Sequence, residues 1–304
     1  MRASVEFLAL YARMSTLACV SLAVAACGGG DAPSPPPADT PATTATPRAT
    51  PAPPALCAQL DVRKVGRVDA LGATELSGLA LSGSGTFWTH NDSGDTPRLF
   101  ALDRRGRLER EVTVTGAEAI DWEDIAIRNR TLYVGDIGDN LAQRSNVTVY
   151  RFPEPQGPSV QAERIDLRYA DGAHDAETLL VDPRSGAIVV VTKDAGGVAG
   201  VYVATKGVLK KRATLKLGIG QPLTAGDVSG DGRTIVLRSY DRAFVYTRRT
   251  GESLARALKR KPCTAGADLL RDGQGESLAL TRDGRAFYTV PEGANAVLRR
   301  YGAP

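Results

Sequence analysis

The 304-residue sequence predicts an all-β fold built from repeats, and three observations indicate it. A triplet of mostly apolar residues recurs every 46 to 54 residues, each time two positions after an acidic or hydroxyl residue: Ser77, Glu123, Glu177, Thr224 and Glu276. Each repeat divides into four strand candidates separated by turn residues. Glycine is abundant, at 32 residues, and no long helical period occurs. Such a period with four short strands is typical of β-propeller blades. We expect five four-stranded blades; six blades, with one degenerate repeat, is the alternative.

Residues 1–26 are expected to be an export signal rather than part of the fold. Residues 14–26 are mostly apolar, too short to span a bilayer, and follow the basic residues Arg2 and Arg13. Their Val-Ala-Ala-Cys ending at Cys27 resembles a bacterial lipoprotein signal. That resemblance implies cleavage before Cys27 and acylation of its thiol; an ordinary secretion signal is the alternative. The protein is therefore expected to be exported and lipid-anchored at the cell envelope, on the outer membrane or the outer face of the cell membrane.

Residues 27–56 are expected to form a stalk. Residues 31–55 hold nine of the chain's 18 prolines, and most of the remainder is alanine and threonine. Such a segment cannot bury enough apolar surface to offset its ordering entropy, so an extended, polyproline-II-rich spacer is expected. The remaining residues, 57–304, are long enough for one all-β domain.

Charge and cysteine content narrow the class of protein further. A net charge of +4, with scattered lysines and arginines, argues against nucleic-acid binding. Cys19 lies in the signal and Cys27 is the lipid site, which leaves Cys57 and Cys263 as an even pair in an exported chain. We expect a disulfide between them, with two free buried thiols as the alternative. No zinc-ligand spacing is present. The domain is expected to be a monomer.

The turn residues divide the sequence into strands, which we give in chain order. The first repeat places strands at 77–82, 87–90, 98–103 and 109–115, and the third strands of the later repeats fall at 147–152, 200–205, 243–248 and 296–301. The last repeat contains only three strand candidates. Residues 60–68 alternate as a strand should and are expected to supply the fourth, which closes the ring and leaves no open edge. This closure also brings Cys57 close to Cys263.

The repeats bring acidic residues to one rim, the expected mouth of the propeller channel. The inner strand of a blade begins on the face where its second strand ends, so both sets of loops converge there. These loops carry Glu75, His90, Asn91, Asp92, Asp95, Asp121, Glu123, Asp136, Asp139, Asn140, His174, Asp175, Glu177, Asp194, Asp241, Glu276 and Glu292.

Carboxylates gathered around one axis repel each other, so some must protonate, pair with a cation or accept hydrogen bonds. Lys193, Arg238 and Arg242 are possible ion-pair partners, and a hard cation such as Ca²⁺ is another solution because it prefers oxygen ligands. The candidate ligands are Glu123, Asp136, Glu177 and Glu276. For acid–base catalysis the candidates are Glu123, Glu177 and His174. The alternative is that the acids only cap turns and hold blades together.

Four motifs resemble a group of exported bacterial β-propeller proteins described as WD-like or as lipoproteins. They are residues 88–95, 132–140, 150–155 and 175–179, which read WTHNDSGD, LYVGDIGDN, YRFPEP and DAETL. The resemblance spans about residues 70–295 and implies the fold and export, but no reaction. More distantly, the acid-lined mouth is similar to calcium-dependent phytase-like and gluconolactonase-like propellers. Their metal ligands have no residue-by-residue match here, so no site is carried over, and Thr224 interrupts any fivefold ring of glutamates.

Three functions remain open from the sequence. The first is a membrane-anchored binding or interaction module that holds a ligand or divalent cation at the acidic channel mouth, with a protein, glycan or small molecule as partner. The second is a metal-dependent hydrolase of a phosphoester or lactone. The third is a purely structural envelope protein, in which the rim acids are turn caps.

Overall fold

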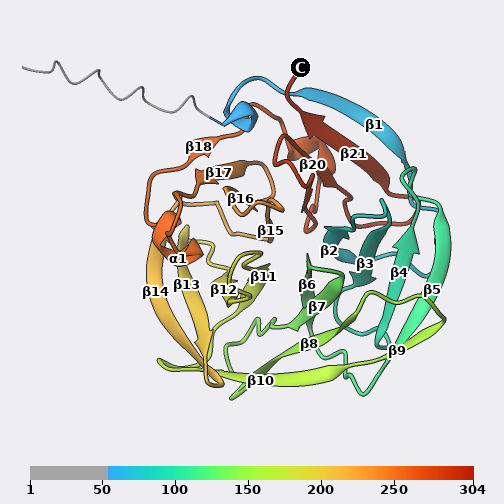
Figure 1. Ribbon diagram of the computed structural model, residues 1–304, viewed down its shortest axis with the longest axis horizontal. Helices are drawn as coiled ribbons and strands as arrows, with labels where there is room; N and C mark the ends of the chain where they lie inside the picture. The colour runs from blue at the N-terminus through green and yellow to red at the C-terminus, as the bar shows by residue number, and fades with distance from the viewer. Residues whose placement is uncertain (1–53) are drawn as a thin grey trace, which may run out of the picture. The chain divides into compact units, whose positions relative to one another are not determined.

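The computed structural model describes residues 54–304, which form an all-β domain whose sheets surround a common axis (Figure 1). The predicted signal peptide, the Cys27 lipid site and nearly all of the predicted stalk lie outside the described residues. Within them, none of the helices has the length and apolar character needed to cross a membrane. The helical segments are short: the 3₁₀ turns η1 (Ala55–Cys57) and η2 (Leu270–Asp272) and the helix α1 (Leu254–Ala257).

The first sheet contains the first repeat and one additional strand. Its strands lie in the order β2 (Leu76–Leu81), β3 (Phe87–Asn91), β4 (Arg98–Leu102), β5 (Leu108–Thr115) and β9 (Ser159–Gln161). The first four are antiparallel neighbours, whereas β9 comes from the following repeat and pairs in parallel with the outer strand β5. The turn residues therefore predict the four strands, but they do not indicate β9.

The second sheet has eight strands and contains the next two repeats. Its strands are β6 (Trp122–Arg128), β7 (Thr131–Asp136), β8 (Val147–Pro153), β10 (Glu163–Tyr169), β11 (Ala176–Val181), β12 (Ile188–Thr192), β13 (Val198–Thr205) and β14 (Val208–Lys216). Each repeat forms an antiparallel run of four strands. The two runs join where the outer strands β10 and β14 pair in parallel over two residues.

The last two sheets complete the ring. One contains β15 (Ala225–Val228), β16 (Thr234–Arg238), β17 (Ala243–Thr247) and β18 (Cys263–Thr264); the other contains β19 (Ala279–Leu280), β20 (Ala286–Thr289), β21 (Val297–Gly302) and β1 (Asp61–Arg67). The N-terminal strand β1 pairs antiparallel with the C-terminal strand β21, so the two ends of the domain share one sheet. The predicted disulfide is confirmed: Cys57 and Cys263 are bonded, with their Cα atoms 5.8 Å apart.

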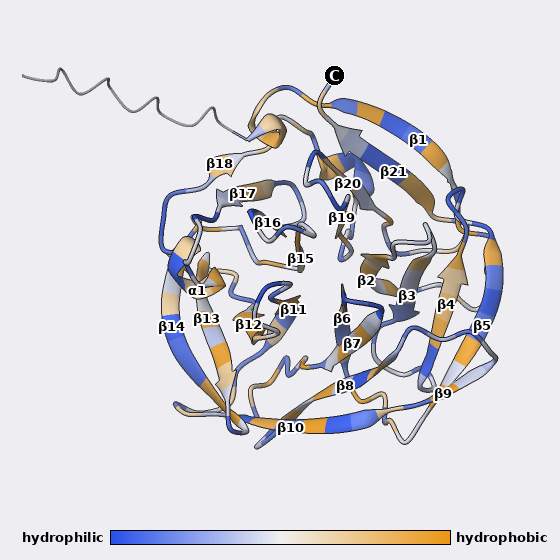
Figure 2. Cartoon of the chain, in the orientation of Figure 1, coloured by the Kyte–Doolittle hydropathy of each residue, from blue (hydrophilic) through white to orange (hydrophobic). Residues whose placement is uncertain are grey.

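Burial decreases from the axis outward. All six residues of the inner strand β11 are buried, whereas the outer strands β5 and β14 alternate between buried and exposed residues. Figure 2 shows the same alternation of apolar and polar residues along the outer strands. The apolar clusters combine side chains of neighbouring repeats; one of them packs Trp88 of β3 with Trp122 of β6 and Tyr150 of β8. Burial of this apolar surface stabilises the ring of sheets.

The loops divide into two opposite faces. Backbone hydrogen bonds join the loop before each inner strand to the loop after the second strand, as between Asp92 N and Glu75 O (2.8 Å) and between Glu292 N and Gln274 O (3.0 Å). We call the face formed by these loops the mouth face. The hairpin turns between inner and second strands lie at the other ends of the strands and form the turn face.

Candidate functional site

The hydroxyl residues at the inner-strand starts connect neighbouring repeats. The Ser77 hydroxyl donates to the backbone oxygen of Glu123 at 2.5 Å, and the Thr224 hydroxyl donates to the backbone oxygen of Gly275 at 2.9 Å. Both side chains are fully buried. Their role is structural, so the three glutamates at the equivalent positions are the residues available for binding.

Two buried aspartates of the inner strands have a similar structural role. Asp124 of β6 accepts a hydrogen bond from the backbone N–H of Leu179 (2.9 Å), and Asp227 of β15 accepts one from that of Leu280 (2.8 Å). Burial raises the pKa of both, that of Asp227 to about 7. These residues perform the blade-joining role that the sequence offered as the alternative for the rim acids.

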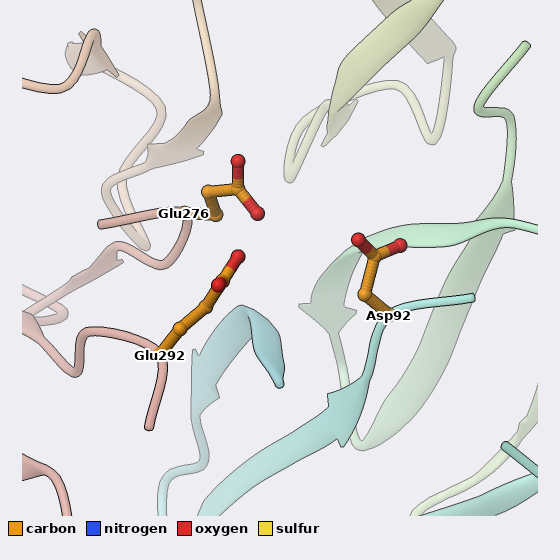
Figure 3. A group of neighbouring side chains, drawn as sticks. All are labelled: Asp92, Glu276 and Glu292. Atoms are coloured by element: carbon orange, nitrogen blue, oxygen red, sulfur yellow. The ribbon is translucent and has the colours of Figure 1, made fainter. Parts of the chain in front are cut away.

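Five other carboxylates converge on the mouth face. Ligand oxygens of Asp92, Glu276 and Glu292 lie within 4.8 Å of one another, and so do those of Asp92, Asp121 and Glu123. Figure 3 shows Glu276 and Glu292 side by side with Asp92 facing them. We call this set the acidic mouth; Asp92 is common to both of its groups.

The acidic mouth holds protons more tightly than exposed carboxylates do. Burial and then the nearby carboxylates of Asp121 and Glu276 raise the pKa of Asp92 to about 6. Burial and neighbouring Glu276 raise the pKa of Glu292 to about 8. The pKa of Glu123 is raised well above its ordinary value by burial, with Glu177 and Asp92 adding to it. The cluster therefore favours bound protons or a bound cation over five negative charges.

Glu123 has an unsatisfied oxygen at this position. Its side chain is buried, and Oε2 has no hydrogen-bond partner among residues 54–304. An unpaired buried acceptor costs about 1–3 kcal/mol. The mouth offers only oxygen ligands, the type that hard divalent cations such as Ca²⁺ prefer. The residues present thus fit a hard cation.

Glu177 also has an oxygen, Oε2, without a hydrogen-bond partner among residues 54–304, but it differs from Glu123 in forming an ion pair. Its Oε1 forms an ion pair with the Lys193 ammonium, which also lies 3.9 Å from Glu276. Burial and Glu276 raise the pKa of Glu177, and Lys193 acts in the opposite direction. Tyr240 donates to Glu276 Oε1 at 2.9 Å. Proton donors therefore line one side of the mouth.

The four predicted metal ligands do not share one group. Glu123 lies in one group and Glu276 in the other, while Glu177 is paired with Lys193. Asp136 forms a buried ion pair with Arg144 at 2.8 Å. Asp92, which both groups share, was a predicted rim residue but not a predicted metal ligand.

The other rim acids and amides serve the loops or face solvent. Asn91 donates to Asp95, which binds Arg98 at 2.8 Å. Asp139 accepts the backbone N–H groups of Gln143 and Arg144, and its own N–H donates to Asp175. Asp241 accepts the Ser239 hydroxyl. The exposed members of the predicted set are Glu75, Asn140 and Asp194.

Neither histidine belongs to the acidic mouth. His90 is completely buried, lies edge-on to Trp122, and has its Nδ1 2.8 Å from the Asn91 oxygen. Burial lowers the pKa of His90 to about 4, so the ring is neutral at pH 7. His174, predicted as a possible base, contacts Tyr202 and Asp171 through Nε2 at 2.8 and 3.2 Å.

Sequence reasoning missed the roles of Arg144 and Tyr240. Both lie in loops that follow a second strand, which is the only signal the sequence contains for them. Of the cations suggested as ion-pair partners, only Lys193 reaches the mouth. Arg238 is buried and faces Asp272 at 3.5 Å, and Arg242 is exposed beside Asp241.

The mouth face also holds the exposed large apolar side chains of the described domain. They come from the loops that lead into inner strands, from the loop after β7, and from the first residue of β13; they are Leu71, Ile120, Leu141, Val198, Ile219 and Leu270. Isolated apolar residues are ordinary on a surface, but their restriction to one face distinguishes that face from the other.

Comparison with known proteins gives structural likeness only. The chain matches no protein-family model and no curated protein. Among solved structures it is similar to a gluconolactonase from Xanthomonas campestris, at 11% identity over 82% of this chain and 92% of that chain, with a TM-score of 0.49. It is also similar to a glucose dehydrogenase, at 11% identity over 80% of this chain and 100% of that chain, with a TM-score of 0.47. At these values, neither activity is assigned to this chain.

Proposed function

We propose that the protein is an exported five-bladed propeller, lipid-anchored through Cys27, that binds a divalent cation at its acidic mouth and serves as a binding module. Five inner strands, β2, β6, β11, β15 and β19, each begin an antiparallel run of four strands, which supports the five-blade count. The signal sequence supports the anchor and the envelope location. The scattered basic residues support a partner other than nucleic acid.

The observation that carries the cation proposal is the unpaired Oε2 of Glu123. Glu123 belongs to a group of three carboxylates, so a bound cation improves both the solvation of this residue and the repulsion among its neighbours. Ca²⁺ is the first candidate because it accepts six to eight oxygens in irregular geometry. Water molecules and backbone oxygens complete such a shell.

The exposed apolar residues support an interaction role for the same face. They surround loops whose centre is acidic, so a partner surface that meets this face gains apolar contact at the edge and polar contact in the middle. The proposed partner is a protein, a glycan or a small molecule.

The test is thermal and chemical unfolding of the full-length protein after chelation, and then with Ca²⁺, Mg²⁺ or Mn²⁺. A cation that binds only the folded state raises the free energy of unfolding by about 2.7 kcal/mol at a hundredfold excess over its dissociation constant. Asp92→Asn removes the carboxylate shared by both groups and should abolish this increase.

The matched control is Asp194→Asn, an exposed acid on the same face that belongs to neither group. It should retain the full increase. If no cation stabilises the unsubstituted protein, or if both variants respond alike, the cation proposal is wrong. The mouth acids would then have a structural role, as expected if the protein is a purely structural envelope protein.

A metal-dependent hydrolase of a lactone or phosphoester is the second candidate. Its support is the arrangement of Glu177, Lys193 and Tyr240 beside the carboxylates, because general acid–base catalysis requires proton donors and acceptors within reach of a substrate. Screening an aliphatic lactone and p-nitrophenyl phosphate with each cation tests it. Hydrolysis that requires a cation and is lost in Glu177→Gln supports the enzyme; cation binding without turnover leaves the binding module.

A further inference from the structure

The turn face contains a cavity that the proposed function does not use. Its volume is about 330 Å³, and residues from all five repeats line it, at the ends of the inner strands opposite the acidic mouth. This volume is at the lower end of the range for small-molecule sites. Leu81, Ile127, Val228 and Leu280 give it an apolar lining.

Three arginines lie at this cavity, which we call the turn-face pocket: Arg128, Arg130 and Arg282. Among residues 54–304, the Arg128 side chain has one long hydrogen bond, to the Pro183 oxygen at 3.4 Å. Arg130 forms a long ion pair with Glu154, at 3.8 Å, and remains mostly exposed. No ion pair involves the Arg282 side chain within residues 54–304. The guanidinium groups therefore keep most of their hydrogen-bonding capacity.

Glu154 lies 3.8 Å from Arg130, but four other acids of the turn face already have partners other than these arginines: Asp182, Asp231, Asp283 and Asp227. Asp182 holds Arg248 through two contacts of 2.6 and 2.9 Å. Asp231 and Asp283 accept the hydroxyls of Ser229 and Thr281 and cap their turns. Asp227 is the acid that lines the pocket, and both of its oxygens accept backbone N–H groups. Three positive groups and one carboxyl leave the pocket positively charged.

The local backbone is unusual at two of these arginines. Arg130 follows Asn129 in the tight turn between β6 and β7, and both residues have positive φ, 59° and 49°. This conformation is unfavourable for a side chain as large as arginine, and glycine is the usual residue there. Arg282 passes over Gly230, where a Cβ atom would lie 2.5 Å from Arg282 Cγ.

From this geometry we infer that the turn-face pocket binds a small organic anion, a carboxylate or phosphate ester with an apolar body. The guanidinium groups form charge-assisted hydrogen bonds with the anionic group. The body packs against the aliphatic lining below, which inorganic anions cannot do. The site is independent of the acidic mouth, since it lies at the other ends of the inner strands and uses none of the same residues.

Isothermal titration calorimetry on the full-length protein tests this inference. The protein is first stripped of divalent cations by chelation and then dialysed free of chelator, because the chelator is itself an organic carboxylate. The probes are phenyl phosphate, inorganic phosphate and benzylamine. We expect phenyl phosphate to bind about tenfold more tightly than inorganic phosphate, and benzylamine not to bind. The double substitution R128Q/R282Q should weaken phenyl phosphate binding about tenfold or more.

The matched control is Arg285→Gln, which removes an exposed arginine from the same hairpin as Arg282 but outside the pocket lining. Its affinity for phenyl phosphate should stay within about twofold of that of the unsubstituted protein. Equal binding of phenyl phosphate and inorganic phosphate, an equal loss in the control, or no binding of phenyl phosphate at millimolar concentration would overturn the inference. Gly230→Ala, which displaces Arg282 without removing charge, should also weaken binding.

Discussion

The two faces of the domain use the same residue type in opposite ways. On the mouth face, the carboxylates crowd together and the pKa values of Asp92 and Glu292 are raised to about 6 and 8. On the turn face, hydrogen bonds and ion pairs lower the pKa of Asp182, even against burial. The pocket arginines Arg128 and Arg282 form no ion pair within residues 54–304, whereas Lys193 of the mouth face is paired with Glu177. Both of the binding sites that we propose therefore lie where charged groups are incompletely neutralised by the described residues.

The largest expected effect comes from a paired acid. Asp182→Ala leaves the Arg248 guanidinium buried and without its carboxylate. Removal of one partner of a buried pair costs about 3–5 kcal/mol. Urea denaturation should show this loss in the free energy of unfolding. A loss below about 1 kcal/mol would mean that the Asp182–Arg248 pair contributes no more to the free energy of unfolding than an exposed ion pair does.

Substitution of a carboxylate of the acidic mouth should not destabilise the protein in the absence of a cation. Glu123→Gln removes a buried carboxyl whose pKa is raised, so the chelated protein should be at least as stable as the unsubstituted one. The same variant should lose the cation-dependent increase of about 2.7 kcal/mol. Thermal melts with and without Ca²⁺ measure both quantities. Destabilisation of the chelated variant would show that Glu123 has a structural role like that of Asp124.

The raised pKa values of the mouth acids also determine how the free energy of unfolding depends on pH. The folded pKa values of Asp92 and Glu292, about 6 and 8, exceed their ordinary values of 3.8 and 4.5, so between these limits the folded state binds more protons than the unfolded state. The free energy of unfolding of the chelated protein should fall as pH rises through that window.

His90 acts in the opposite direction, but only between its folded pKa of about 4 and its ordinary 6.5, so the clearest interval is pH 6.5–8. Chemical denaturation at several pH values measures the slope. Saturating cation should reduce it, because a bound cation holds the carboxylates ionised. A stability that rises across this interval would contradict the raised pKa values of the mouth.

The smallest expected effect separates stability from binding on the turn face. Arg130→Gly relieves an unfavourable positive φ and should stabilise the domain by about 1 kcal/mol. The same change removes one guanidinium from the turn-face pocket and should weaken phenyl phosphate binding. Denaturation and calorimetry on one preparation check both effects. Stabilisation with unchanged affinity would remove Arg130 from the anion site.

Much of the fold could be predicted from local patterns. The period of the apolar triplets places the inner strands, and the short last repeat together with the alternating residues 60–68 predicts the pairing of β1 with β21. The parallel contacts of β9 with β5 and of β10 with β14 were not predictable, because they involve two or three residues whose partners lie in another repeat. The helix α1 was missed for a similar reason: four residues are too few for a helical period.

The candidate site was only partly predictable. The sequence indicates which acids reach the mouth face, because one strand alternation places them there, but it does not show which of them form ion pairs. Asp136 and Glu177 resemble Glu123 in the sequence, and only the tertiary structure pairs them with Arg144 and Lys193. The turn-face pocket was not predicted at all, since its three arginines come from two repeats separated by more than a hundred residues.

By itself the sequence determined the repeat, the order of the four strands within a repeat, the disulfide partners and the face on which the acids gather, because these depend on periodicity and on spacing along the chain. The tertiary structure alone decided which charges are neutralised. Neutralisation depends on distances of 3–4 Å between side chains far apart in sequence, and ion-pair and desolvation energies change steeply over those distances. The binding sites that we propose lie where that neutralisation is incomplete.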